Sequence, residues 1–308
     1  MKFIEESRFE LEKEYRQNWS EGYQSAFKKI FQLDDGRIIY IGVGFSQGIW
    51  NMNNKEIELC CGDVDYMRYD PYYRICRDFS GEICQLDNSI LVLEYRYMMI
   101  CYDIITGKII CQSKSDSVNS ICPISENEFY SANDKGIVTR WKYENAKLDK
   151  CKSDINDAKI IFGLNDRRFV TFNGKEIKII GKETIILNIK LEVFEFYQHK
   201  DYLIARCYDD IKVWDLNNNK CIHNFTTRLV KKSNRKSKIK PKITSISFVD
   251  NFLLSCNDGE INIFNLDSGK LENTCKGVGS FIYVLDDKQM IIVNDTTVHI
   301  MNIINIIN

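Results

Sequence analysis

The sequence lacks the short motifs that mark the common catalytic and metal sites. It contains no His-Glu-x-x-His, no Gly-x-Ser-x-Gly, no glycine-rich phosphate loop followed by Lys-Ser/Thr, and no cysteine and histidine spacing suited to zinc. Only three of its 308 residues are histidine. These absences predict a protein that is not an enzyme and that needs no metal, other cofactor or small-molecule substrate.

The features of secreted and membrane-spanning proteins are also missing. Glu5 and Glu6 stand where a signal peptide needs apolar residues. No run approaches the roughly 18 apolar residues of a membrane span. The twelve cysteines are scattered, with no Cys-x-x-Cys and one adjacent pair, Cys60-Cys61. We therefore expect a reduced intracellular protein, cytoplasmic or nuclear, whose cysteines act as small apolar core residues.

The sequence does contain a repeated strand pattern. Residues 211–216 read Ile-Lys-Val-Trp-Asp-Leu, and a polar turn sequence follows them. Six other segments share this pattern, and the residues that correspond to Trp214 are Trp50, Tyr102, Trp141, Ile180, Phe264 and Met301. Successive spacings are 52, 39, 39, 34, 50 and 37 residues. Four of these lie near a period of roughly 40, which predicts one small unit repeated seven times, with insertions in the two long intervals.

Turn signals bound each repeat. The run 133–136, Asn-Asp-Lys-Gly, precedes the pattern at Trp141, and the run 267–270, Asp-Ser-Gly-Lys, follows the pattern at Phe264. Asn, Asp and Gly tolerate the positive φ that tight hairpins require. A further apolar strand, such as residues 202–207, lies upstream of each first turn. Each unit is therefore predicted to contain four short strands, which is one propeller blade.

Residues 27–308 resemble a series of divergent WD40 repeats. Trp214-Asp215 matches the dipeptide for which that family is named. The resemblance implies an all-β, seven-bladed WD40-type β-propeller. It also implies a non-catalytic scaffold or adaptor that presents loops to protein partners within a complex. We expect Trp214 to pack between neighbouring sheets.

The chain departs from the WD40 pattern in its polar residues. Many WD40 repeats carry Gly-His before the first strand, but none of His199, His223 and His299 follows a glycine. The turn aspartate of the family has matches at Asp258 and Asp295. We therefore expect apolar packing, more than a buried polar network, to hold the sheets.

The seventh repeat ends too soon to contain its outer strand. Only residues 304–308 follow the pattern around Met301. In WD40 proteins an N-terminal strand often fills this place, and residues 8–15 alternate well enough to do so. The alternative is an amphipathic helix, because Glu and Lys favour helix. The predicted organisation is an N-terminal segment, 1–26, and a propeller, 27–308, with insertions near 61–80 and 227–242.

The first insertion is rich in tyrosine. Its candidate partner-binding residues are Tyr66, Tyr69, Tyr72, Tyr73 and Arg74. Tyr and Arg are frequent anchors of protein interfaces, because they bury a large area at modest entropic cost. The alternative is a divergent part of a blade whose tyrosines pack on their neighbours.

The second insertion is basic. The net charge of the chain is −1, so affinity for an anion has to come from a local patch. Residues 228–242 contain eight basic residues and no acid: Arg228, Lys231, Lys232, Arg235, Lys236, Lys238, Lys240 and Lys242. Such a run suits phosphates of RNA or DNA, an anionic lipid surface or an import receptor. The alternative is a solvated surface loop without a partner.

Both insertions should join the last strand of one blade to the first strand of the next. We therefore predict that they share one face and that this face contacts partners. The preferred function is a scaffold or adaptor in a multiprotein complex. The alternatives are nucleic-acid or ribonucleoprotein binding through residues 228–242, and a substrate receptor for a modifying complex.

Overall fold

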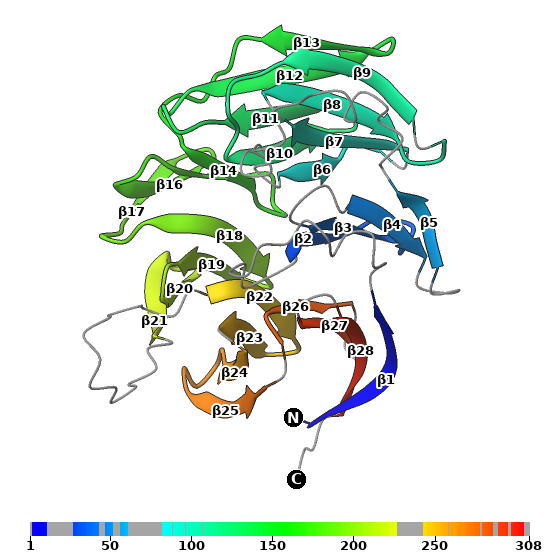
Figure 1. The fold of residues 1–308 in the computed structure, drawn as a ribbon. Coiled ribbons are helices and arrows are strands. Elements are labelled where there is room, and N and C mark those ends of the chain that lie inside the picture. The colour runs from blue at the N-terminus through cyan, green and yellow to red at the C-terminus, as the bar shows by residue number, and fades with distance from the viewer. Residues whose placement is uncertain are drawn as a thin grey trace, which may run out of the picture. The chain divides into compact units, whose positions relative to one another are not determined.

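The computed structural model describes residues 2–10, 27–42, 47–51, 56–60, 82–87, 89–95, 97–106, 108–226, 243–257, 259–277, 279–285, 289–294 and 297–304. All regular structure in these ranges is β-strand, as Figure 1 shows. No helix of the described ranges is long and apolar enough to cross a membrane. The strands form four-stranded antiparallel sheets, which confirms the predicted all-β class. The chain divides into two compact units, Lys28–Glu192 and Met1–Phe27 with Val193–Asn308.

The unit Lys28–Glu192 contains four sheets, each made of strands consecutive in sequence. The first is β2 (Phe27–Gln32), β3 (Ile38–Gly42), β4 (Gln47–Asn51) and β5 (Glu56–Cys60). The second is β6 (Ile83–Gln85), β7 (Ile90–Tyr95), β8 (Met98–Asp103) and β9 (Lys108–Lys114). The third is β10 (Ser120–Ser125), β11 (Glu128–Ala132), β12 (Val138–Glu144) and β13 (Lys147–Cys151). The fourth is β14 (Ile160–Gly163), β15 (Phe169–Phe172), β16 (Glu176–Ile180) and β17 (Thr184–Asn188).

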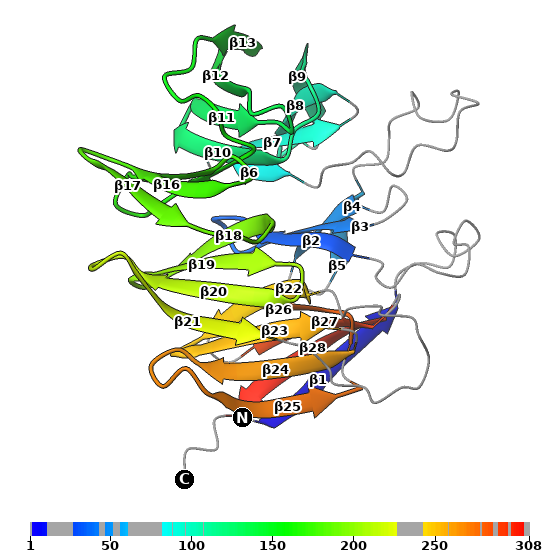
Figure 2. The same cartoon turned by 90° about the vertical axis from the view of Figure 1, so that its left-hand side faces the viewer.

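The other unit contains three sheets (Figure 2). The first is β18 (Val193–His199), β19 (Tyr202–Cys207), β20 (Asp210–Asp215) and β21 (Lys220–Thr226). The second is β22 (Ile243–Val249), β23 (Phe252–Asn257), β24 (Glu260–Asn265) and β25 (Leu271–Lys276). The third has the order β1 (Lys2–Glu10), β28 (Thr297–Ile304), β27 (Gln289–Asn294) and β26 (Phe281–Val284).

The sequence repeat matches the sheets one to one. The seven reference positions lie on β4, β8, β12, β16, β20, β24 and β28. The first six of these are the third strand of their sheet in chain order, and β28 lies between β27 and β1. Each pairs with the strand before it in the chain at an equivalent place; Trp214 faces Leu203, and Phe264 faces Leu253. The repeat prediction is therefore confirmed for every sheet, while closure into one seven-bladed ring stays a prediction.

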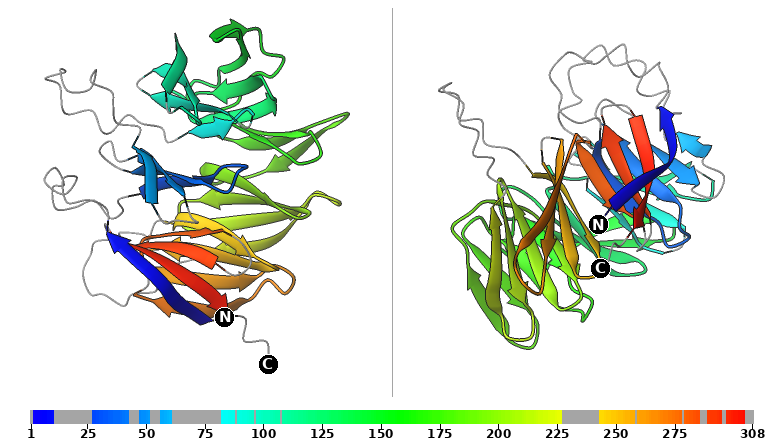
Figure 3. Two further views of the ribbon diagram at one scale, coloured as in Figure 1. Left: turned by 90° about the vertical axis from the view of Figure 1, so that its right-hand side faces the viewer. Right: turned by 90° about the horizontal axis from the view of Figure 1, so that it is seen from below.

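An N-terminal strand completes the last sheet. β1 pairs antiparallel with β28 from Lys2 opposite Ile304 to Glu10 opposite Thr297, with an irregularity between Glu5 and Ser7 (Figure 3). A strand can satisfy the N–H and C=O groups along the open edge of β28, whereas a helix cannot. The structure thus confirms the predicted closing strand and not the alternative helix. The strand spans residues 2–10, whereas the sequence pattern placed it at residues 8–15. Residues 11–26 lie outside the described ranges, and the boundary at 26/27 stays a prediction.

Within each unit, apolar side chains fill the spaces between consecutive sheets, as the sequence predicted. Met99 and Cys101 of β8 share one buried cluster with Phe129 of β11 and Trp141 of β12. Trp214 is buried as well. Of the described cysteines, five are buried as the sequence predicted: Cys84, Cys101, Cys122, Cys207 and Cys256. The prediction is wrong for Cys221, which is exposed, and Cys111, Cys151 and Cys275 are only partly buried. Close packing of such clusters is the main favourable term in folding.

Hydrogen bonds between neighbouring sheets add to this packing. Ser245 Oγ accepts from the backbone N–H of Ile282 at 2.9 Å, and Ser247 Oγ from that of Val284 at 2.8 Å. Both bonds run from β22 to β26, which are edge strands of two successive sheets. In the other unit Ser120 Oγ accepts from Ile161 N–H at 2.8 Å in the same manner. These serines hold adjacent edge strands at a fixed separation, a role that the sequence pattern did not predict.

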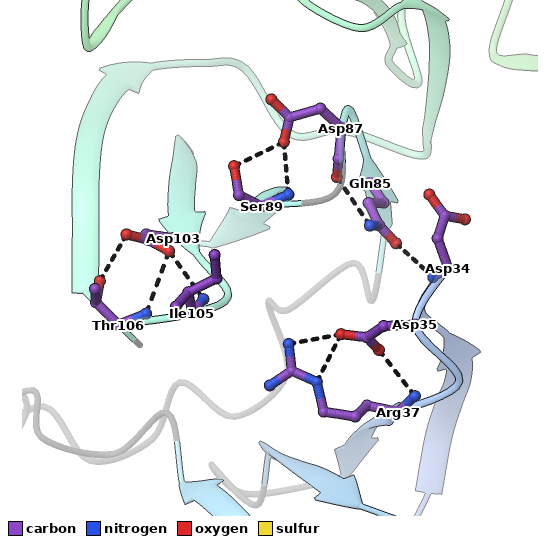
Figure 4. A network of polar contacts seen from close by, with 9 residues as sticks. All are labelled: Asp34, Asp35, Arg37, Gln85, Asp87, Ser89, Asp103, Ile105 and Thr106. Carbon is purple, nitrogen blue, oxygen red and sulfur yellow. Dashed lines mark hydrogen bonds and ion pairs between the residues drawn. The ribbon is translucent and has the colours of Figure 1, made fainter.

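Aspartates at the hairpin turns bind backbone amides of their own turns (Figure 4). Asp87 Oδ1 accepts from the N–H groups of Ser89 and Ile90, both at 2.7 Å. Asp103 accepts from the N–H of Ile105 at 2.8 Å and from Thr106 Oγ1 at 2.8 Å. Within the described part of the chain, no three histidine, cysteine or acidic side chains are placed to hold a metal ion. The hydrogen bonds of Asp87 and Asp103 make both carboxylates structural elements of their turns.

Candidate protein-interaction surface

The residues proposed from sequence for partner binding lie outside the described ranges. This applies to Tyr66, Tyr69, Tyr72, Tyr73, Arg74, Arg228, Lys231, Lys232, Arg235, Lys236, Lys238, Lys240 and Lys242, and to the turn residues Asp258 and Asp295. The strands on either side are described. β5 ends at Cys60 and β6 begins at Ile83, and β21 ends at Thr226 and β22 begins at Ile243. Each insertion thus joins the last strand of one sheet to the first of the next, as predicted; their common face stays a prediction.

The described residues on both sides of segment 227–242 bind the turn between β19 and β20. On the N-terminal side, Thr226 Oγ1 donates to Asp210 Oδ1 at 2.6 Å. On the C-terminal side, the backbone N–H of Ile243 donates to the carbonyl of Tyr208 at 3.1 Å. The last residue of β21 and the first residue of β22 are therefore both bound at this one turn.

Arg206, near the end of β19, makes a third contact at this place. Its Nη1 donates to the carbonyl of Ile243 at 2.8 Å, and its Nη2 donates to Glu195 Oε2 at 3.2 Å. The hydroxyl of Tyr197 donates to the same carboxylate oxygen at 2.6 Å. The Arg206 side chain is only 15% exposed and that of Glu195 28%, so water screens this pair less than a surface ion pair.

The surroundings keep this cluster in one charge state. Burial lowers the pKa of Arg206, but the nearby Tyr197 and Glu195 outweigh this effect and hold it above its ordinary value. Burial raises the pKa of Tyr197 well above its ordinary value, and the negative charge of Glu195 raises it further. The guanidinium thus stays charged and the phenol stays neutral across the physiological pH range.

Phe194, beside Arg206, and Tyr208 form a pair of exposed aromatic rings. Phe194 is 37% exposed and Tyr208 is 42% exposed. Their ring centroids are 6.4 Å apart and the ring planes differ by 48°. The Arg206 Cζ lies 5.8 Å from the centroid of the Phe194 ring, within range of a cation–π interaction. We refer to Phe194, Arg206 and Tyr208 as the aromatic–arginine surface.

Two carboxylates lie at the same turn. Asp209 and Asp210 are 6% and 7% exposed, respectively. They follow Tyr208 directly, at the turn to which both sides of the eight-cation segment bind. Among the described residues, this turn therefore carries two buried carboxylates. The chemistry available at this place is contact through rings and charges, which suits recognition of a partner.

Sequence reasoning missed most of this surface. The sequence patterns single out none of Phe194, Glu195, Arg206 and Tyr208 as binding residues. One usable signal is an aromatic residue directly before Asp209-Asp210, where turns are usually polar. The other is the opposite charge of Glu195 and Arg206, which face each other across β18 and β19. That pairing can be identified only after the register is fixed.

The four-stranded antiparallel sheets define an all-β fold of the WD40 β-propeller type. A solved structure with this fold, titled "Structure of U3-55K", superposes on 92% of this chain and on 97% of its own, with a TM-score of 0.67 and 10% sequence identity. In total 1145 solved chains match, so this fold is common and does not by itself identify a function. No protein-family model matches the sequence, and no curated protein matches it.

Proposed function

We propose that the protein is a non-catalytic scaffold or adaptor that binds protein partners within an intracellular complex. The aromatic–arginine surface is the observation that carries this proposal. Aromatic and arginine side chains supply most of the binding energy in many protein interfaces. Folds of the WD40 type commonly mediate such interactions, which supports the same function.

The rigidity of the supporting sheets favours recognition by a preformed surface. Phe194 and Arg206 lie on adjacent strands of one sheet, and Arg206 also binds the first residue of the next. A side chain held in this way loses little conformational freedom on binding. We propose that the tyrosine-rich residues 66–74 and the basic residues 228–242 add further contacts, as the sequence predicts.

Nucleic-acid binding through residues 228–242 is the less favoured alternative. It requires cations that are available to neutralise phosphates. Arg206 lies where this segment joins the sheets. Two of its donor atoms already bind Glu195 and the carbonyl of Ile243. The buried Asp209 and Asp210 at the same turn would repel a phosphate backbone.

Affinity purification from cells, followed by mass spectrometry, tests the proposal. We would compare the intact protein, the double variant Phe194→Ala/Tyr208→Ala, and a variant lacking 228–242. Leu271→Ala is the matched control, because Leu271 is an apolar residue of the same unit and is 53% exposed. The proposal predicts a partner set that the control retains and the double variant loses. Failure to recover any partner with the intact protein would contradict the adaptor function.

A further inference from the structure

Two cysteines stand directly opposite each other on neighbouring strands of the second sheet. Cys101 on β8 pairs with Cys111 on β9, and the pairs before it run in regular register from Met98 opposite Lys114. Residues opposite one another in an antiparallel ladder project to the same face, with their Cα atoms about 4.5–5.5 Å apart. A disulfide needs a Cα separation of about 4.4–6.8 Å. The ladder therefore holds this pair of free thiols at a distance that a disulfide can bridge.

The register leaves Cys101 with one cysteine within reach. Val92 on β7 lies between Cys84 on β6 and Cys101, opposite both of them. Cys84 and Cys101 are thus two strand spacings apart, roughly 9–10 Å, which is too far for a disulfide. In the ladders that the structure describes, the other cysteines face residues of other types. The geometry therefore selects the link from Cys101 to Cys111.

The two thiols differ in their access to water. Cys101 is fully buried in the cluster around Met99, whereas Cys111 is partly buried and packs against the rim of that cluster. A hydrogen bond joins the two thiols. Burial raises the pKa of both; the neighbouring Cys111 raises that of Cys101 further, and the hydrogen bond partly offsets the rise for Cys111. A dissolved oxidant therefore meets Cys111 first, and it reacts slowly because little thiolate is present.

We propose that Cys101 and Cys111 are an oxidisable pair that closes to a disulfide between β8 and β9. The oxidant is a peroxide. The sulfur of Cys111 attacks one oxygen of hydrogen peroxide, the O–O bond breaks, water leaves, and Cys111 becomes a sulfenic acid. The sulfur of Cys101 then attacks the sulfenic sulfur, the S–O bond breaks, and a second water leaves. Two thiols and one peroxide thus give one disulfide and two waters, and the two electrons lost by sulfur reduce the peroxide.

The fixed geometry favours the second step. The thiol of Cys101 is already beside Cys111, so closure within the sheet competes well with further oxidation of the sulfenic acid. The new bond ties β9, an edge strand with a hydrogen-bonded neighbour on one side, covalently to β8. We therefore expect oxidation to slow hydrogen exchange over β9. This device lies in the unit Lys28–Glu192, apart from the aromatic–arginine surface, and does not depend on the adaptor function.

Tryptic mass spectrometry of the full chain tests the pair. Cleavage after Arg96, Lys108 and Lys114 places the two cysteines in separate peptides, 97–108 and 109–114, each with one cysteine. The protein is treated with hydrogen peroxide, and the remaining thiols are blocked before digestion without reductant. We expect the two peptides to be joined, with a mass lower by a pair of hydrogens than their sum, and dithiothreitol should release them.

Variants and an unfolded sample provide the controls. Cys111→Ser should abolish the joined peptides, whereas Cys84→Ala and Cys221→Ser should retain them, and thermal melting checks that each variant is folded. Cys122 is 11 residues after Cys111, close to the 10 residues between Cys101 and Cys111. The chain unfolded in urea should therefore form both links in comparable amounts. The folded protein should favour the link from Cys101 to Cys111 by about tenfold or more.

Three results would overturn the proposal. One is a folded protein in which Cys101 and Cys111 stay as thiols under peroxide that oxidises the exposed Cys221. Another is a link from Cys101 to Cys84 in the folded protein that equals the link to Cys111. The third is the same ratio of links in the folded and the unfolded chain, which would show that the strand register does not select the pair.

Discussion

The indole Nε1 of Trp141 donates a 2.8 Å hydrogen bond to Oγ of Ser131, and both residues are buried. The sequence predicted mainly apolar packing, so this bond is a polar exception on β11 and β12. Ser255 occupies the equivalent place on β23, two residues after the partner of Phe264. Phe264 has no N–H to donate, and among the described residues Ser255 Oγ has no hydrogen-bond partner. Two serines in corresponding positions thus make opposite contributions to stability.

We predict that Ser131→Ala destabilises the protein by about 1–3 kcal/mol, because it leaves the buried indole N–H without an acceptor. Ser255→Ala should be neutral or stabilising, since it removes a buried hydroxyl that is not satisfied. Equilibrium urea unfolding of the two variants measures the difference. Equal destabilisation by the two substitutions would contradict this account.

Glu195→Ala should destabilise the protein by about 2–4 kcal/mol. The change leaves the poorly exposed Arg206 without its counter-ion and Tyr197 without its acceptor, and breaking a fully buried pair costs about 3–5 kcal/mol. Glu144→Ala is the control, because the Lys142–Glu144 pair is 40% and 56% exposed. Water and salt screen such an exposed pair, so its loss should cost much less. Thermal melting at matched pH compares the two, and a larger effect of Glu144→Ala would refute the expected order.

Thr106→Val should raise the pKa of Asp103. The hydrogen bond from Thr106 is the largest cause that holds this pKa below its ordinary value, followed by the N–H of Ile105. A lowered folded-state pKa gives stability that is present above the unfolded value of 3.8 and is lost as pH falls through the folded value. The variant should therefore lose less stability in acid than the natural protein. NMR titration of the Asp103 carboxyl checks the shift, and an unchanged pKa would disprove the assignment to Thr106.

A variant without residues 1–10 should expose the outer edge of β28. Unpaired N–H and C=O groups along an edge strand invite pairing with a second chain. We expect faster hydrogen exchange at residues 297–304 and concentration-dependent association, measured by mass spectrometry and light scattering. A variant without residues 305–308 is the control, because those residues follow the paired strand. Unchanged exchange at β28 after removal of β1 would contradict the observed pairing.

The sequence predicted the strands because their signals are local. Around Trp214, apolar and polar residues alternate, and turn residues stand beside them. Each of these signals involves only a few neighbouring residues, and the same local pattern recurs in every sheet. The serine bonds from Ser245 to Ile282 and from Ser120 to Ile161 join residues about 40 apart in sequence, so no local pattern indicates them. The aromatic–arginine surface likewise depends on the register between β18 and β19 and on where β22 begins. The predictions for residues 66–74 and 228–242 stay predictions, because these residues lie outside the described ranges.

The pairing of Lys2 with Ile304 also determines when the last sheet can form during synthesis. Of the described strands, β1 is made before all the others and its partner β28 after them. At the usual rate of about 5–20 residues per second, β1 waits for roughly 15–60 s before its partner exists. Throughout that time its hydrogen-bonding groups are available to other chains. The newly made protein is therefore most exposed to mispairing before its C-terminal strand emerges.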